Sequence, residues 1–307
     1  MMLNAYPRCR IVPQPNHEVS FEVSGTERLR WHFGPQYPRP FFYPLIGPSG
    51  NTLTRMGHPG AANHDHHRSI WFAHNKVLGI DFWSDAAGSS IRQREWLAYH
   101  DSDQEAVMAA DLDWFDGHNP APLLTQRLVA AIQPGPDAEI TLELQSTFVP
   151  KSESLEFQKT NFGFLAVRVA RSLSEHFGGG RLTNSEQRQT EQATFGQPAR
   201  WMDYSGPVDA AGTIEGITYF DHPDNPGYPN RWHVREDGWM GASICMTSPQ
   251  MTQRQRPLSL RFQLHAHTGD LKPDRAEAIA GKFRESSGFA VTRSSRKHQQ
   301  WTVSRIA

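Results

Sequence analysis

The stretch EVSFEVSGTERLRWHF, residues 18–33, decides how the fold is interpreted. Apolar side chains occupy every second position on both sides of the Ser-Gly-Thr turn at residues 24–26: Val19, Phe21, Val23, Leu29, Trp31 and Phe33. Because successive side chains of a strand point to opposite faces, this period predicts two β-strands, each with one buried face. The glycine in the turn between them favours a hairpin.

Short segments of the same kind follow along the rest of the chain, separated by glycine and proline. The further segments expected to be strands are 39–45, 68–74, 78–83, 90–99, 105–115, 123–133, 138–149, 163–173, 199–204, 214–221, 231–236, 240–247, 258–267 and 299–306. Residues 273–285 lack the alternation, and Pro273 suits the first turn of a helix. With no low-complexity linker, the sequence predicts a single all-β sandwich domain, residues 1–307, with one short C-terminal helix.

The composition excludes several classes of partner. The 31 basic and 32 acidic residues nearly cancel, so no strong field would attract nucleic acid. The chain contains no run of eighteen apolar residues, which argues against a membrane partner, and its start lacks the apolar core of a signal peptide. Cys9 and Cys245 are the only cysteines and form no CxxC pair. These features favour a cytoplasmic protein without a disulfide framework.

Histidines are concentrated in one part of the chain. Five of the fifteen lie within residues 58–74: His58, His64, His66, His67 and His74. Neutral imidazole exchanges protons near pH 7 and binds metals, so the cluster indicates chemistry rather than packing. If residues 66–74 form a strand, one face carries His66, Arg68, Ile70, Phe72 and His74. This face is expected to be the floor of a pocket, and Trp71 would lie on the opposite face.

Three other segments carry polar residues beside aromatic ones. Asp81 and Trp83 suit a sugar, because a carboxylate accepts hydroxyl hydrogen bonds while an indole covers C–H groups. The segment WMDYSG (201–206) contains Asp203 and Tyr204. The loop at 219–237 holds three prolines, and long loops in compact domains tend to carry function. On a strand after that loop, one face would present Arg231, His233 and Arg235 to a ligand.

A metal site is an open alternative at this stage. His265 and His267 are two positions apart, which places two imidazoles on one strand face, as metal sites on β-scaffolds do. Two ligands do not complete a site, and the same spacing also suits a solvated face. The chain has no Walker A, GxGxxG, GxSxG or HExxH motif, so no cofactor is expected.

Four long motifs resemble an uncharacterised bacterial family often labelled PmoA-like, or methane oxygenase PmoA. They are RPFFYPLIGPSGNTLTRMGHP (39–59), HDHHRSIWFAHNKVLGIDFW (64–83), WMDYSG (201–206) and FDHPDNPGYPNRWHVRED (220–237). The label fits poorly, since the methane monooxygenase subunit is an integral membrane protein. The resemblance implies instead a β-supersandwich of the galactose-mutarotase-like kind, whose relatives are aldose epimerases, polysaccharide lyases and glycosidase domains. In that group a concave sheet holds a saccharide.

These observations predict a cofactor-free carbohydrate-active enzyme, of epimerase, lyase or hydrolase type, that acts on a small-molecule carbohydrate by acid–base chemistry. The expected catalytic residues are His66, His67, Asp81 and His222. The expected substrate-binding residues are His64, Arg68, Trp71, Trp83, Asp203, Tyr204, His233 and Arg235. Two alternatives remain, a metal-dependent enzyme with histidine ligands and a non-catalytic sugar-binding protein. We expect the 58–83 and 221–235 segments to converge on one pocket, including His222.

Overall fold

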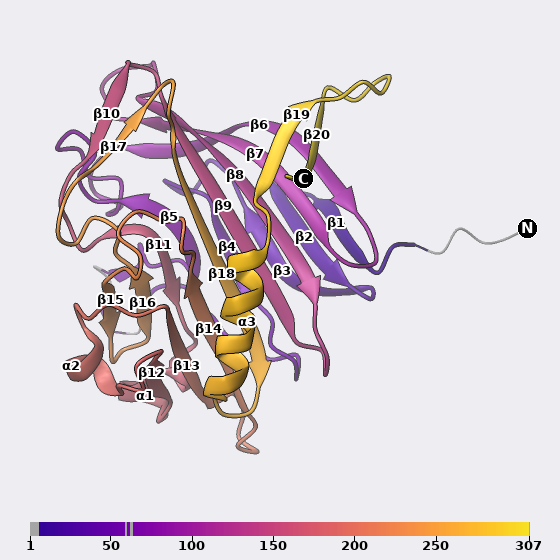
Figure 1. Ribbon diagram of the computed structural model, residues 1–307, viewed down its shortest axis with the longest axis vertical. Helices are drawn as coiled ribbons and strands as arrows, with labels where there is room; N and C mark the ends of the chain where they lie inside the picture. The colour runs from indigo at the N-terminus through magenta and orange to yellow at the C-terminus, as the bar shows by residue number, and fades with distance from the viewer. Residues whose placement is uncertain (1–5, 59, 62–63, 307) are drawn as a thin grey trace, which may run out of the picture.

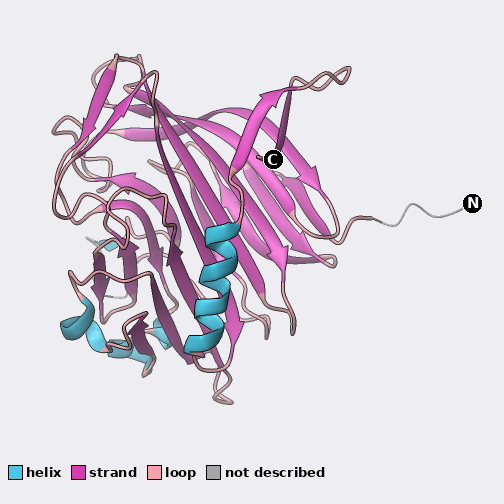
Figure 2. Ribbon diagram, viewed as in Figure 1, coloured by secondary structure: helices cyan, strands magenta, loops and turns pink. Residues whose placement is uncertain are grey.

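Two antiparallel eight-stranded sheets pack face to face in the computed structural model, which describes residues 6–58, 60–61 and 64–306 (Figure 1). Strands account for most of the regular structure (Figure 2). The all-β sandwich predicted from the alternating pattern is therefore confirmed.

The first sheet contains the N-terminal strands and four strands from the middle of the chain. Its order is β1 (Cys9–Gln14), β2 (Glu18–Val23), β3 (Thr26–His32), β4 (Phe41–Leu45), β5 (Ile70–His74), β11 (Gly163–Arg168), β16 (Trp239–Ala242) and β15 (Trp232–Arg235). The predicted opening hairpin is β2–β3, in which Val19 lies opposite Trp31 and Phe21 lies opposite Leu29. All four side chains are buried between the sheets, as their alternation predicts.

The second sheet contains longer strands. Its order is β12 (Arg181–Asn184), β13 (Trp201–Pro207), β14 (Ile214–Asp221), β18 (Leu258–Thr268), β9 (Ile140–Pro150), β8 (Leu124–Pro134), β7 (Ala106–Phe115) and β6 (Ser90–Asp101). Two small ribbons accompany the sandwich, β10 (Ser154–Phe157) with β17 (Gln250–Gln253) and β19 (Phe289–Arg293) with β20 (Trp301–Arg305). Phe72 of the first sheet contacts Phe262 of the second at 6.2 Å between ring centres. The two sheets thus share one core.

The longest helix is α3 (Pro273–Glu285), with the bounds predicted from sequence. It lies against the outer face of the second sheet (Figures 1 and 2), where Phe283 packs with Trp201 and Phe220. Shorter helical segments are α1 (Glu175–Gly178), α2 (Thr190–Thr194) and a 3-10 turn at Arg171–Leu173. No helix in the described part of the chain is long and apolar enough to cross a bilayer.

The alternation predicted for residues 66–74 holds only from Ile70 onward, and the face predicted to line the pocket points into the core instead. β5 begins only at Ile70, because Ser69 before it has a positive φ of 56° that interrupts extended backbone. Ile70 and Phe72 point into the core between the sheets, while Trp71 and Ala73 point to the outer face. The predicted strand at 78–83 is also absent, and only a single bridge joins Val77 to Ile80 there.

Candidate functional site

An apolar cluster covers the outer face of the first sheet near its β15 end. It is formed by residues that alternate with core positions on β4, β5, β11 and β16, together with one residue of the loop after β5: Phe41, Trp71, Ala73, Trp83, Ala166 and Trp239. The outer face of an antiparallel sheet is commonly polar, so a buried apolar cluster there is unusual and is covered by the neighbouring loops. Trp239 is central, stacking on Trp83 with 5.1 Å between ring centres.

The loop before β5 places histidines against this aromatic cluster. The His67 ring lies 4.7 Å from Trp239 and 5.5 Å from Trp71, where it stacks. The centre of the His67 ring lies 4.3 Å from that of His66 and 5.2 Å from that of His64. The histidine cluster recognised in the sequence therefore extends from the indoles outward.

A pocket with a volume of about 370 Å³ lies between these histidines and the end of the first sheet. Its lining residues are His64, His66, His67, Asn75, Asp81, Trp83, Ser84, Phe162, Arg168, His233, Arg235, Asp237 and Trp239. This volume falls in the range of small-molecule sites. Residues 64–84 and 233–239, far apart in sequence, meet here because β5 and β16 both pair with β11.

His67 is the most unusual residue of the pocket. Its side chain is only 3% exposed, and its Nδ1 atom has no hydrogen-bond partner among the described residues. Burial, together with the neighbouring His66 and Arg168, holds the pKa of His67 far below its usual range. His67 is therefore neutral at pH 7, and its buried polar nitrogen lacks the partner that such atoms normally have.

His233 approaches from the opposite side of Trp239, with 4.6 Å between the ring centres. Its Nδ1 lies 3.0 Å from the carbonyl oxygen of Asn161. Since a carbonyl oxygen only accepts, this contact places the hydrogen on Nδ1 and leaves Nε2 as an acceptor. Burial, followed by the charge of Arg235, lowers the pKa of His233 to about 4.

Arg168 and Asp237 form the charged wall of the pocket. Both terminal nitrogens of Arg168 donate to Asp237, at 2.7 and 3.0 Å, and His58 Nε2 lies 3.1 Å from the same carboxylate. Burial alone would raise the pKa of Asp237, but its bonds to Arg168 outweigh that effect and lower it. Neither residue was predicted from the sequence. An arginine within the apolar strand GFLAVRVA was the available signal, because a fully buried charge is usually paired.

Asp81 lines the pocket, but its oxygens are already engaged. They accept hydrogen bonds from the backbone N–H of Trp83 at 2.6 Å and from the Ser84 hydroxyl at 2.7 Å. Burial opposes ionisation, and these bonds outweigh it, so the pKa of Asp81 is lowered. A carboxylate in this state holds the turn that presents Trp83 and is a poor proton donor.

Arg68 and Tyr204 support the site from outside the pocket lining. Arg68 donates two hydrogen bonds to Asp85, at 3.0 and 2.5 Å, and Arg39 contacts the same carboxylate. Tyr204 is fully buried, and its hydroxyl donates to the carbonyl oxygen of Arg235 at 2.5 Å. Trp71 lies beneath the histidines, where its ring packs against Trp83.

His222 and Asp203 are not brought to this pocket, which corrects their predicted place. His222 accepts a hydrogen bond from Arg261 at 3.0 Å and packs against Phe283 of α3. Its pKa is lowered to about 4 by burial and then by Arg261. The reason is topological: β14, which ends at Asp221, belongs to the second sheet, whereas β15 belongs to the first. The chain crosses the sandwich between His222 and His233.

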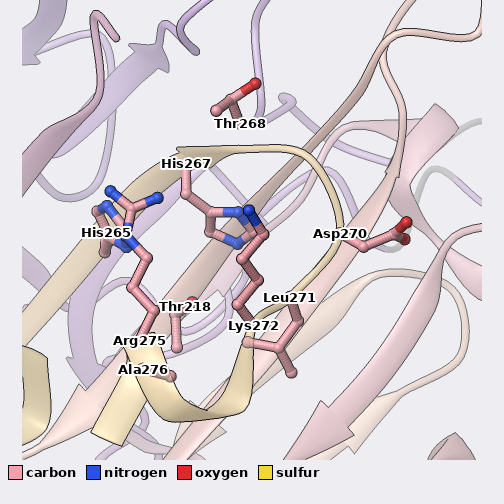
Figure 3. Close-up of a pocket in the computed structure, with 9 residues that line it drawn as sticks. All are labelled: Thr218, His265, His267, Thr268, Asp270, Leu271, Lys272, Arg275 and Ala276. Atoms are coloured by element: carbon pink, nitrogen blue, oxygen red, sulfur yellow. The ribbon is translucent and has the colours of Figure 1, made fainter. Parts of the chain in front are cut away.

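Asp203 instead belongs to a polar network on the outer face of the second sheet, where it contacts His267. Figure 3 shows His267 together with His265 and Arg275. His267 Nε2 lies 2.9 Å from Asp203, and His265 Nε2 lies 2.8 Å from Glu139, which also binds Arg275 of α3. The space enclosed there is about 10 Å³, enough for roughly one water. Each imidazole thus ties strand β18 to a carboxylate. Within the described residues, no group of three or more His, Cys, Asp or Glu side chains is arranged to hold a metal ion.

Solved structures with some similarity to the chain include two sugar-related proteins. A candidate mutarotase, YeaD, from Salmonella typhimurium is 11% identical, with 82% of this chain and 90% of that one covered and a TM-score of 0.31. A GalM/aldose epimerase homologue from C. elegans is 6% identical, with 85% and 99% covered and a TM-score of 0.35. Among curated proteins, none matches the sequence.

One family model matches the chain from residue 18 to residue 281. This range includes every strand and loop that lines the pocket, and it ends within α3, before the β19–β20 ribbon. The chain therefore belongs to the family of unknown function DUF6807.

Proposed function

We propose that the chain is a carbohydrate-active enzyme that binds one sugar unit in the pocket and moves a proton on it. The observation that carries this proposal is the combination of stacked indoles with the buried His67 ring, whose Nδ1 atom has no hydrogen-bond partner among the described residues. A sugar ring has an apolar C–H face for the indoles and hydroxyl groups for the imidazoles. The resemblance of the motifs to the PmoA-like family, and through it to galactose-mutarotase-like proteins, suggests the same ligand class.

Buried polar atoms without partners near the pocket favour the binding of a polar ligand. A buried polar group without a partner costs about 1–3 kcal/mol. Besides His67, the indole N–H groups of Trp71, Trp83 and Trp239 have no acceptor within the described part of the chain. These atoms are closed to solvent, so a hydroxylated ligand would recover part of this cost only where a ring turns to meet it.

The pocket offers neutral groups for proton transfer. His233 presents Nε2 as a neutral acceptor, and its tautomer is fixed by Asn161. His67 is neutral and a poor acid, so its role is hydrogen bonding to a hydroxyl group. His66, at the rim of the indole cluster, remains our proposed general acid and base. Ring opening, epimerisation or elimination needs only such proton movements.

The experiment is a titration of the purified protein with a panel of monosaccharides, followed by calorimetry and by proton NMR of the sugar. We expect one or more sugars to bind, and His67→Gln to weaken that binding about tenfold, because a hydrogen bond in a buried site is lost. His66→Gln should lower turnover by about 10²–10⁴-fold. The exposed His118→Gln serves as the matched control and should change neither quantity.

Two results would contradict the proposal in different ways. If no sugar in the panel binds, the ligand class is wrong. If a sugar binds but stays chemically unchanged in the NMR spectrum after long incubation, the protein is a non-catalytic sugar-binding protein. Hydrogen bonds lower the pKa of both Asp81 and Asp237, so neither carboxyl group readily holds a proton that it could donate. This observation favours the non-catalytic sugar-binding protein as the second candidate. The proposal also places the protein in the cytoplasm and assigns it no cofactor.

A further inference from the structure

The formal charges that line the pocket balance. Arg168 and Arg235 contribute two positive charges, and Asp81 and Asp237 contribute two negative ones. His67 and His233 are held neutral by burial. A ligand with a net negative charge therefore meets no surplus of guanidinium charge in this set of residues.

The guanidinium groups at the pocket are, moreover, already bound to carboxylates. Arg168 forms a two-pronged ion pair with Asp237, and Arg68 forms another with Asp85 beside the pocket. Arg55 differs, because its Nε and Nη1 atoms lack partners among the described residues. It does not line the pocket, however, and lies behind Asp237, where its Nη2 donates to the Asp237 carbonyl oxygen at 2.6 Å.

Arg235 receives its carboxylate from a separate element. Glu191 in the short helix α2 accepts a hydrogen bond from Arg235 Nη1 at 2.6 Å and another from the backbone N–H of Glu236 at 2.8 Å. The Arg235 guanidinium also lies over the Phe195 ring, 4.8 Å from its centre, which fixes its direction. Glu191 is therefore the carboxylate partner of this exposed arginine.

Resting on the proposed function, we propose that Glu191 is a specificity-determining residue: by neutralising Arg235 it makes the pocket select an uncharged sugar over the matching acid sugar. An acid sugar would have to displace Glu191 from Arg235, or leave its own carboxylate desolvated without a partner. Either event costs free energy that a neutral sugar does not incur. Specificity here comes from Glu191, which competes with the carboxylate of an acid sugar for the Arg235 guanidinium.

The test compares matched sugar pairs, D-glucose with D-glucuronate and D-galactose with D-galacturonate, by calorimetry on the full chain. The wild-type protein should bind the neutral member of at least one pair more tightly. Glu191→Gln keeps the size of the side chain and a hydrogen-bond acceptor but removes the charge. In this variant the affinity ratio should shift toward the uronate by about five- to tenfold, the range between an exposed ion pair and a charge-assisted hydrogen bond.

Two further variants control this result. Glu186→Gln breaks a similarly exposed surface pair, in which Glu186 lies 3.1 Å from Arg200, and should leave the ratio unchanged. Adding Arg235→Gln to Glu191→Gln should reverse the shift, because the freed guanidinium is then removed.

The outcomes separate the inference from the proposed function. Wild-type protein that binds no sugar of either kind refutes the function itself. Wild-type protein that prefers the uronate refutes the inference and leaves the function standing, and this comparison requires no variant to fold. A correct wild-type preference with an unchanged ratio in Glu191→Gln removes Glu191 from the explanation.

Discussion

His265 and His267 lie two positions apart on β18, yet their surroundings move the two pKa values in opposite directions. Burial, followed by the neighbouring His267, lowers the pKa of His265 to about 4 in spite of its bond to Glu139. Burial also acts on His267, but the charge of Asp203 and the bond to it outweigh burial and raise its pKa. The same strand therefore favours the neutral form of histidine at position 265 and the charged form at position 267.

The His267–Asp203 tie predicts a pH-dependent stability. Because the folded-state pKa of His267 lies above its unfolded value of 6.5, its stabilisation is complete below pH 6.5 and is lost as the pH rises through the folded value. His267→Gln should therefore destabilise the protein more at pH 6 than at pH 9, with a cost of about 1–3 kcal/mol at the lower pH. Urea unfolding at both pH values measures this difference.

A different pH dependence in the His267→Gln variant would contradict this prediction. A cost that is equal at both pH values, or greater at pH 9, would mean that His267 is uncharged in the folded protein. The exposed His118→Gln should show no such difference and controls for the buffer.

At the scale of elements, the sequence predicted regular segments well and their interruptions poorly. The β2–β3 hairpin and α3 follow from patterns that a few neighbouring residues carry. The start of β5 does not, because it depends on the backbone angle of Ser69, and serine has no strong preference for a positive φ. Trp71, and not Phe72, lies on the outer face with the aromatic cluster.

Phe283 is the larger of the two side chains that α3 buries against the second sheet. This side chain packs in a cluster with Trp201 and Phe220, meets the His222 ring at 4.7 Å and lies 5.2 Å from the Arg261 guanidinium. Phe283→Ala should destabilise the protein by about 3–5 kcal/mol, the usual cost of a large cavity. Guanidinium unfolding followed by circular dichroism gives the value, with the exposed Glu285→Ala as control.

A small effect of Phe283→Ala, below about 1 kcal/mol, would show that α3 contributes little to the folded state. In that case the polar contacts of the helix, from Arg275 to Glu139 and from Glu277 to Arg200 and Trp201, would contribute more than its apolar packing.

At the scale of the whole molecule, the sequence predicted which segments meet but not on which side. The histidine loop and the strand with His233 and Arg235 do line one pocket. His222 was misplaced because nothing local shows that the chain changes sheets between β14 and β15. Asp237 and Trp239 were missed for a related reason: their roles depend on Arg168 and Trp83, which are distant in sequence.

The core that joins the two sheets predicts cooperative unfolding. Aromatic contacts such as Phe72–Phe262 and Tyr219–Trp232 cross from one sheet to the other. Neither sheet can therefore expose its inner face without exposing that of its partner. We expect the chain to unfold as one domain, so that near-UV and far-UV circular dichroism give superimposable urea transitions. Two separated transitions would refute the single-domain organisation.

The stacked indoles of Trp83 and Trp239 have an optical consequence. Two identical chromophores with 5.1 Å between their centres and planes only 12° apart couple their electronic transitions. Such a pair absorbs light as a unit, and its signal depends on the angle between the rings. A molecule that enters beside them and turns either ring would alter that signal. A change in this signal on adding a ligand would therefore report occupancy of the pocket, and no dye would need to be attached to read it.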